Sequence, residues 1–167
     1  MNMRVIILAT VLISASAWAD PAQHLARGNA WRALDEFGAA LAAYDAGLRE
    51  ASGHAGLLAD LLADLLAERA LTLHRLGETD AARAMLSQAI AAAGPRNAAP
   101  FTARAGLSLL AGQDAATDLA EALARAPNDA RAMDLQRLAQ ARRGSGAAPD
   151  ARRMEGLRHA FGPWLAE

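Results

Sequence analysis

The sequence predicts an all-α protein. Of its 167 residues, 46 are alanine and 25 are leucine, and all 17 basic residues are arginine. Alanine, leucine, arginine and glutamate all favour helices, and these small preferences add up over a chain of this length. After Ala19, the β-branched residues that favour strands are one isoleucine, Ile90, and four threonines. Helices are therefore expected throughout the chain after Ala19.

The composition also excludes several kinds of functional site. Without cysteine or lysine, the chain cannot form disulfides, a thiolate nucleophile, cysteine-ligated zinc, a Schiff base or a phosphate-binding P-loop. No serine lies in a nucleophile elbow, and no glycine pattern of a dinucleotide site is present. The histidines lack the spacing of metal-binding pairs; they are His24, His54, His74 and His159. We expect no enzymatic activity, no cofactor and no metal.

The first 19 residues have the pattern of a signal peptide. Arg4 precedes an apolar run over residues 5–17, which is shorter than the roughly 18 to 20 residues that span a bilayer. Small residues, Ala17 and Ala19, stand where a leader peptidase cleaves. We expect cleavage after Ala19 and a periplasmic or secreted protein without stable membrane insertion. The arginine-only, alanine-rich composition is typical of a GC-rich bacterial genome and favours the periplasm; an uncleaved anchor is the alternative.

Two units of the sequence then repeat in register, 42 residues apart. The first comprises Gly28, Trp31, Leu34, Asp35, Phe37, Ala40, Tyr44, Gly47 and Leu48, and the second Ala70, Leu73, Leu76, Gly77, Thr79, Ala82, Leu86, Ala89 and Ile90. Small residues let two helices approach closely, while a large residue three or four positions away fills the gap. Each unit therefore predicts a helical hairpin, with Asp35 or Gly77 at the turn and with Trp31 and Tyr44 shielded from solvent.

This spacing resembles the tetratricopeptide repeat (TPR). The resemblance implies an α-solenoid of about three helical hairpins over residues 20–129, followed by C-terminal capping helices. A third, weaker unit fits a second helix and the proline that ends it, through Ala115, Leu119, Ala122, Leu123 and Pro127. Its first helix, near residues 102–111, is out of register by one or two residues.

The step between the first two units exceeds the roughly 34 residues of the family, so we expect an unusually long helix over residues 53–76. An apolar stripe on that helix predicts its core-facing side; it consists of Leu57, Leu58, Leu61, Leu62, Leu65 and Leu66. Asp60, Asp64 and Glu68 recur every four residues, which we interpret as the solvated face opposite the leucines. Paired carboxylates of a small hydrolase are the alternative, although no matched second group accompanies them.

The C-terminal part predicts two further helices. The first covers residues 130–143, with Met133, Leu135, Leu138 and Ala139 at helical spacing, and residues 144–149 predict a flexible linker. The terminal segment, residues 150–167, predicts a capping helix begun by Asp150, with Met154, Leu157 and Phe161 on one face. Such a helix can cover the open apolar end of a repeat stack. The alternative is that Phe161, Trp164 and Leu165 dock onto another protein, because aromatic residues dominate interface energetics.

The resemblance to TPR proteins implies a non-catalytic scaffold or assembly factor that binds a peptide or a partner helix in a concave groove. In that geometry the residues facing the groove would be Asn29, Arg32, His74 and Arg75. Arg32 and Arg75 favour an acidic ligand, since a guanidinium can hold a carboxylate through two hydrogen bonds; ordinary solvated arginines are the alternative. The alternative function is a structural subunit docked onto a larger envelope complex through its C-terminal aromatic helix.

Charge is unevenly distributed along the chain. Residues 20–130 contain 9 arginines and 14 acidic residues, whereas residues 131–158 contain 7 arginines and 3 acidic residues. The partner is therefore expected to be a protein or peptide, with self-association of the basic and acidic parts as a further alternative. Export argues against nucleic acid as the partner.

Overall fold

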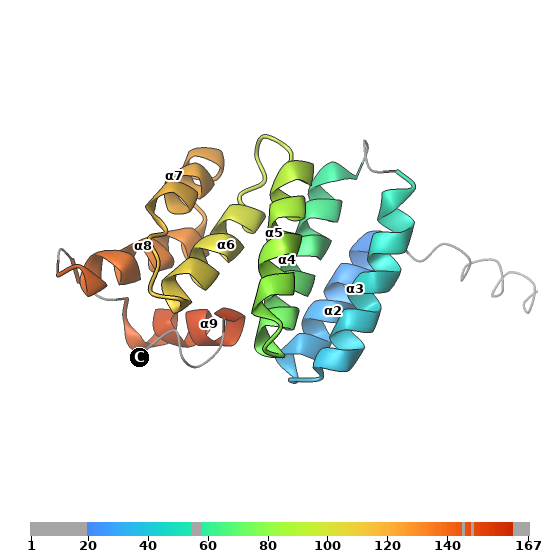
Figure 1. The fold of residues 1–167 in the computed structure, drawn as a ribbon, viewed down its shortest axis with the longest axis horizontal. Coiled ribbons are helices and arrows are strands. Elements are labelled where there is room, and N and C mark those ends of the chain that lie inside the picture. The colour runs from blue at the N-terminus through green and yellow to red at the C-terminus, as the bar shows by residue number, and fades with distance from the viewer. Residues whose placement is uncertain (1–19, 55–57, 145, 148, 162–167) are drawn as a thin grey trace, which may run out of the picture.

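A computed structural model of the chain describes residues 20–54, 58–144, 146, 147 and 149–161. These residues form eight helices and no strand, which confirms the all-α class. The helices are α2 (Pro21–Ala33), α3 (Phe37–Ser52), α4 (Ala59–Arg75), α5 (Thr79–Ala92), α6 (Ala99–Leu110), α7 (Ala116–Arg125), α8 (Ala130–Arg142) and α9 (Ala151–Phe161) (Figure 1). The predicted signal peptide, residues 1–19, lies outside the described residues.

Helices that follow one another in the chain pack together. α2 packs on α3, α4 on α5 and α6 on α7, while α8 packs on both α7 and α9 (Figure 1). α4 occupies the centre of the arrangement, because it also contacts α2, α3, α6 and α9. None of the helices in the described part of the chain is long and apolar enough to cross a membrane.

The first two helix pairs turn where the repeated sequence pattern places the turn. Asp35 and Gly77 both have left-handed backbones, with φ of 58° and 86°. Glycine adopts this conformation without steric cost, and aspartate tolerates it better than most residues. Each turn therefore allows the second helix to fold back onto the first.

The predicted nesting of small against large residues is present. A Cβ atom built on Gly28 would lie 2.2 Å from the ring of Tyr44, and one on Gly47 would lie 2.8 Å from a methyl group of Leu65. Tyr44 and Leu65 are both fully buried. Trp31, in contrast, is 40% exposed. Of the two aromatic residues expected to be shielded from solvent, only Tyr44 therefore belongs to the core.

Aspartates begin three of the helices. Asp20 accepts the backbone N–H of Ala22 at the start of α2, and Asp150 accepts that of Arg153 at the start of α9. Asp129 accepts the backbone N–H groups of Arg131 and Ala132 and so caps α8. A carboxylate satisfies amide groups that have no partner within the helix.

The long helix expected over residues 53–76 is present as α4, which at 17 residues is the longest of the described helices, but its expected start at residue 53 is wrong. α3 ends at Ser52, Gly53 follows it, and α4 begins only at Ala59. The extra length between the first two repeat units therefore lies in the connection, part of which, residues 55–57, is outside the described residues. Most of the leucine stripe faces the core. Leu65 is fully buried, Leu58, Leu61 and Leu62 pack against the same cluster, and Leu66 packs against the larger one. Leu57 lies outside the described residues.

The first helix of the third unit also begins earlier than expected, since α6 starts at Ala99 rather than near Thr102. Pro100 stands in its first turn, where proline is well tolerated because the missing N–H has no partner there in any case. In the helix that follows, Ala115, Leu119 and Ala122 are buried as the pattern predicts, and Leu123 packs against the core.

Candidate binding groove

The candidate site is a groove of about 410 Å³ between four helices. Its walls come from α2, α4, α6 and the beginning of α8, and its lining residues are Leu25, Asn29, Asp64, Glu68, Ala99, Thr102, Asp129, Ala130 and Arg131. Within α2, α4 and α6 the lining residues are three or four positions apart, so they share one face of each helix, whereas the start of α8 contributes the consecutive residues 129–131. The groove therefore follows equivalent faces of three helices that are not consecutive in the sequence.

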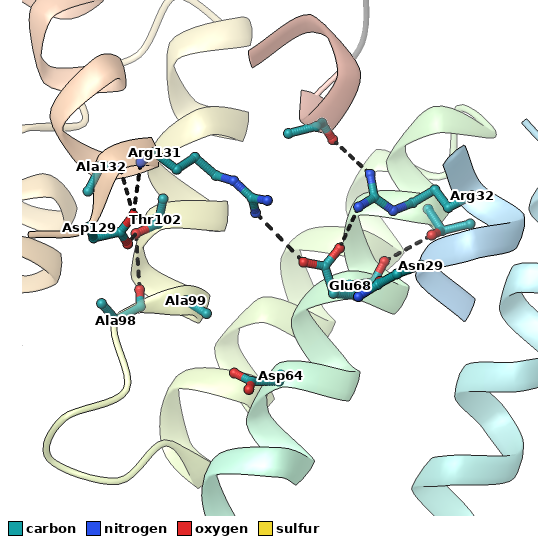
Figure 2. Close-up of polar contacts among 12 residues, drawn as sticks. Asn29, Arg32, Asp64, Glu68, Ala98, Ala99, Thr102, Asp129, Arg131 and Ala132 are labelled. Atoms are coloured by element: carbon teal, nitrogen blue, oxygen red, sulfur yellow. Dashed lines mark hydrogen bonds and ion pairs between the residues drawn. The ribbon is translucent and has the colours of Figure 1, made fainter. Parts of the chain in front are cut away.

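Several polar groups along the groove are fixed by hydrogen bonds. Asn29 accepts a hydrogen bond of 2.8 Å from the hydroxyl of buried Tyr44, and Thr102 donates one of 2.9 Å to Asp129 (Figure 2). Asp64 accepts a hydrogen bond of 2.8 Å from the amide of Asn97. These side chains therefore present a preorganised polar surface that needs little ordering when another molecule binds.

Glu68 is the electrostatic centre of this region. Its carboxylate lies 3.0 Å from a guanidinium nitrogen of Arg32 and 3.7 Å from one of Arg131, so it links α2 to α8 across the groove (Figure 2). Arg32 is the buried member of this pair, with a side chain only 7% exposed, and it also donates to the backbone carbonyl of Ala160 at 3.4 Å. Arg131 remains 40% exposed.

The charge facing the groove is mainly negative. Asp64, Glu68 and Asp129 line it together with a single guanidinium, that of Arg131. Burial raises the pKa of Asp64 above its ordinary value, the hydrogen bond from Asn97 partly offsets this, and the nearby carboxylates of Asp60 and Glu68 raise the pKa further. A positively charged group placed in the groove would therefore relieve repulsion between these carboxylates.

The four groove residues predicted from the sequence do not lie together. Asn29 lines the groove, and Arg32 lies one turn further along α2 but is buried against Glu68. His74 and Arg75 are at the far end of α4 and are not among the lining residues. His74 contacts the hydroxyl of Thr79 at 3.1 Å, and burial, followed by the charges of Arg75 and Arg83, lowers its pKa.

Arg75 connects α4 to the turn between α2 and α3. It donates to the carboxylate of Asp35 at 3.1 Å and lies 5.0 Å from the centre of the Phe37 ring. With Arg75 at the α2–α3 turn and Arg32 buried against Glu68, neither arginine faces the groove. An acidic ligand was expected because of these two arginines, and neither is placed to contact a ligand in the groove.

The predicted docking residues at the C-terminus are only partly described. Phe161 is fully buried against Gly106, so its ring does not lie where an exposed anchor would. A ring in the chain's own core fits the capping interpretation of this helix. Trp164 and Leu165 lie outside the described residues.

Sequence reasoning missed most of the groove. The carboxylate spacing predicts a solvated face of Asp60, Asp64 and Glu68. Asp60 is exposed, but Asp64 is half-buried and Glu68 is only 16% exposed. Thr102, Asp129 and Arg131 belong to the third unit and its successor, where the repeat pattern is out of register. Of these three residues, only Asp129 could have been singled out from the sequence, because an aspartate directly before a predicted helix is expected to cap it. Among the described residues, no group of three or more potential ligands is placed to hold a metal ion.

Comparison of the chain with protein-family models, with curated proteins and with solved structures gave no match.

Proposed function

We propose that the protein is an exported, non-catalytic scaffold of TPR type that binds a segment of another protein in the groove between α2, α4, α6 and α8. In this proposal α2–α3, α4–α5 and α6–α7 are three hairpins of a short solenoid, and the first helix of each hairpin lines its concave side. The observation that carries the proposal is that the lining residues share one face on all three of these first helices. The N-terminal pattern of residues 1–19 supports a periplasmic location.

The ligand most compatible with the groove is an extended peptide or a partner helix that carries a basic side chain. Leu25 and Ala99 offer apolar contacts, whereas Asp64, Glu68 and Asp129 offer carboxylates. Apolar contact gives affinity, and complementary charge fixes orientation and speeds association. Binding should therefore weaken as the salt concentration rises.

The alternative function, docking onto a larger envelope complex through the C-terminal aromatic helix, has less support. Its described aromatic residue, Phe161, is buried within the chain. Self-association remains a further alternative, which sedimentation at low and high salt would detect.

The test compares the envelope proteins captured by the wild type and by two tryptophan variants. Ala130→Trp places a bulky side chain at an exposed position that lines the groove, and Ala124→Trp places the same side chain at an exposed position on α7, outside the groove. We expect Ala130→Trp to lose the captured partner and Ala124→Trp to retain it. An identical set of captured proteins for all three chains would contradict the groove as the binding site.

A further inference from the structure

The last turn of α9 lies on the same concave face that forms the groove. Phe161 is fully buried, and a Cβ atom on Gly106 would lie 2.2 Å from its ring, so the glycine forms the notch that admits the ring. Gly106 is four residues after the groove residue Thr102 on α6 and therefore on the same face. The notch is thus one helical turn beyond the groove.

On α2, too, a residue one helical turn beyond the groove contacts α9. Arg32 follows the groove residue Asn29 by three positions and donates to the backbone carbonyl of Ala160, in the last turn of α9 (Figure 2). The last carbonyls of a helix have no partner within the helix, and a cation near them is favourable. Arg131, at the start of α8, lies 6.0 Å from the centre of the Phe161 ring. The end of α9 therefore contacts residues from α2, α6 and α8 that continue the groove.

α9 is attached through few buried residues. Its buried residues are Leu157, Ala160 and Phe161, and an ion pair of 2.7 Å joins the 44%-exposed Arg153 to Asp134 on α8. The connection from α8 contains Gly144, with a left-handed φ of 71°, and Gly146. One face of α9 is therefore held from Arg153 to Phe161 by a small set of contacts with the other helices.

We propose that α9 is an intramolecular ligand that occupies the concave face beside the groove and is displaced when a partner helix binds. The α9 seat, defined here as Arg32, Gly106, Arg131 and Asp134, accepts a helix with an aromatic residue in its last turn and a basic residue two turns earlier. This inference rests on the proposed function, because displacement by a partner requires that the groove binds one. The contact is autoinhibitory: partner binding competes with the chain's own α9.

The strength of the contact can be bounded. A short tether gives α9 an effective concentration on the order of 1 mM at its seat. Because α9 occupies its seat at that concentration, the same segment as a free peptide must bind an empty seat with a Kd below about 1 mM. In the wild type, the tethered helix should prevent the peptide from binding at micromolar concentrations.

The test uses the full chain and a fluorescently labelled synthetic peptide of residues 150–161, with fluorescence anisotropy as the readout. Phe161→Ala should weaken the closed state by on the order of a hundredfold, because it removes a buried aromatic ring. We expect this variant to bind the peptide below 1 mM, while the wild type does not bind it at micromolar concentrations. The double variant Gly106→Leu/Phe161→Ala, in which leucine fills the notch, should not bind it.

Hydrogen exchange distinguishes a displaceable helix from an integral part of the core. Phe161→Ala should accelerate exchange in α9 and leave α4 and α6 protected. Gly156→Ala is the matched control, because its Cβ atom meets nothing within 4 Å, and it should leave α9 protected. The inference is overturned if α6 and α8 lose protection together with α9, or if Phe161→Ala shows no saturable peptide binding up to about 1 mM. Neither readout needs an external partner, so they test the seating of α9 independently of the capture experiment. A failed capture experiment refutes the proposed function and, with it, the displacement of α9 by a partner.

Discussion

Gly28→Ala tests the close contact of α2 and α3 in the first hairpin. The added Cβ atom would lie 2.2 Å from Cε1 of Tyr44, whereas carbon atoms in contact are usually about 3.5–4.0 Å apart. The ring cannot move freely, because it is fully buried and its hydroxyl donates to Asn29 at 2.8 Å. Relief of the contact therefore requires that α2 and α3 move apart or that the hydroxyl loses its partner.

The expected effect is a net loss of stability. Overpacking a buried site costs about 1–3 kcal/mol, and losing the hydrogen bond between Tyr44 and Asn29 costs about 1 kcal/mol more. Alanine in place of glycine within a helix returns about 1 kcal/mol. The balance is a destabilisation of about 2 kcal/mol, which corresponds to a fall in Tm of roughly 4–8 °C for a chain of this size.

Thermal and urea unfolding followed by circular dichroism measure this change. Gly38→Ala, on α3, is the matched control, because its Cβ atom meets nothing within 4 Å; it should be neutral or stabilise by up to about 1 kcal/mol. If Gly28→Ala is as stable as Gly38→Ala, then Tyr44 does not pack against Gly28 and the hairpin geometry is wrong.

Three further predictions concern charged and titratable groups. Glu68→Ala should destabilise the protein by about 3–5 kcal/mol, because it leaves the buried guanidinium of Arg32 without a counter-charge. In urea unfolding, the double variant Arg32→Met/Glu68→Leu should recover most of this loss. A double variant as unstable as Glu68→Ala would argue against this ion pair. The raised pKa of Asp64 means that its ionisation disfavours the folded state, so stability is lost as the pH rises from 3.8 through the folded-state pKa. Asp64→Asn should therefore gain stability relative to the wild type between about pH 3.5 and about pH 7 in urea unfolding, and a constant difference would contradict the burial of this carboxyl. The lowered pKa of His74 has the opposite effect on stability, which is lost as the pH falls below the ordinary value of 6.5. His74→Gln should reduce the loss of stability between about pH 7 and about pH 5. An unchanged pH profile would show that the ring is solvated.

The sequence predicted the parts of the fold in which composition and spacing act locally. Helix-favouring residues gave the all-α class, and Gly28, Tyr44, Ala82 and Leu86 gave the close contacts of the first two helix pairs, because nested small and large residues leave a periodic pattern. The start of α4 at Ala59 was not predicted, since an apolar stripe does not show where a helix begins. The start of a helix depends on which backbone groups find partners.

The groove was harder to predict, because it is made by residues from separate units. The spacing of Arg32 gives its face on α2 but does not reveal that Glu68, 36 positions later, takes up its charge. The position of Arg131 at the groove likewise depends on α8 returning to the same face as α2. Such pairings depend on tertiary packing, whereas the repeat pattern records only neighbours within a hairpin.

Site-specific photo-crosslinking in intact cells tests the proposed binding groove most directly. A photoreactive amino acid at position 130 faces the groove, and the same group at position 124 lies on α7 outside it. We predict one discrete crosslinked partner from position 130, reduced at high salt, and none from position 124. Equal crosslinking from both positions, or none from position 130 in a correctly exported and folded chain, would contradict partner binding in the groove.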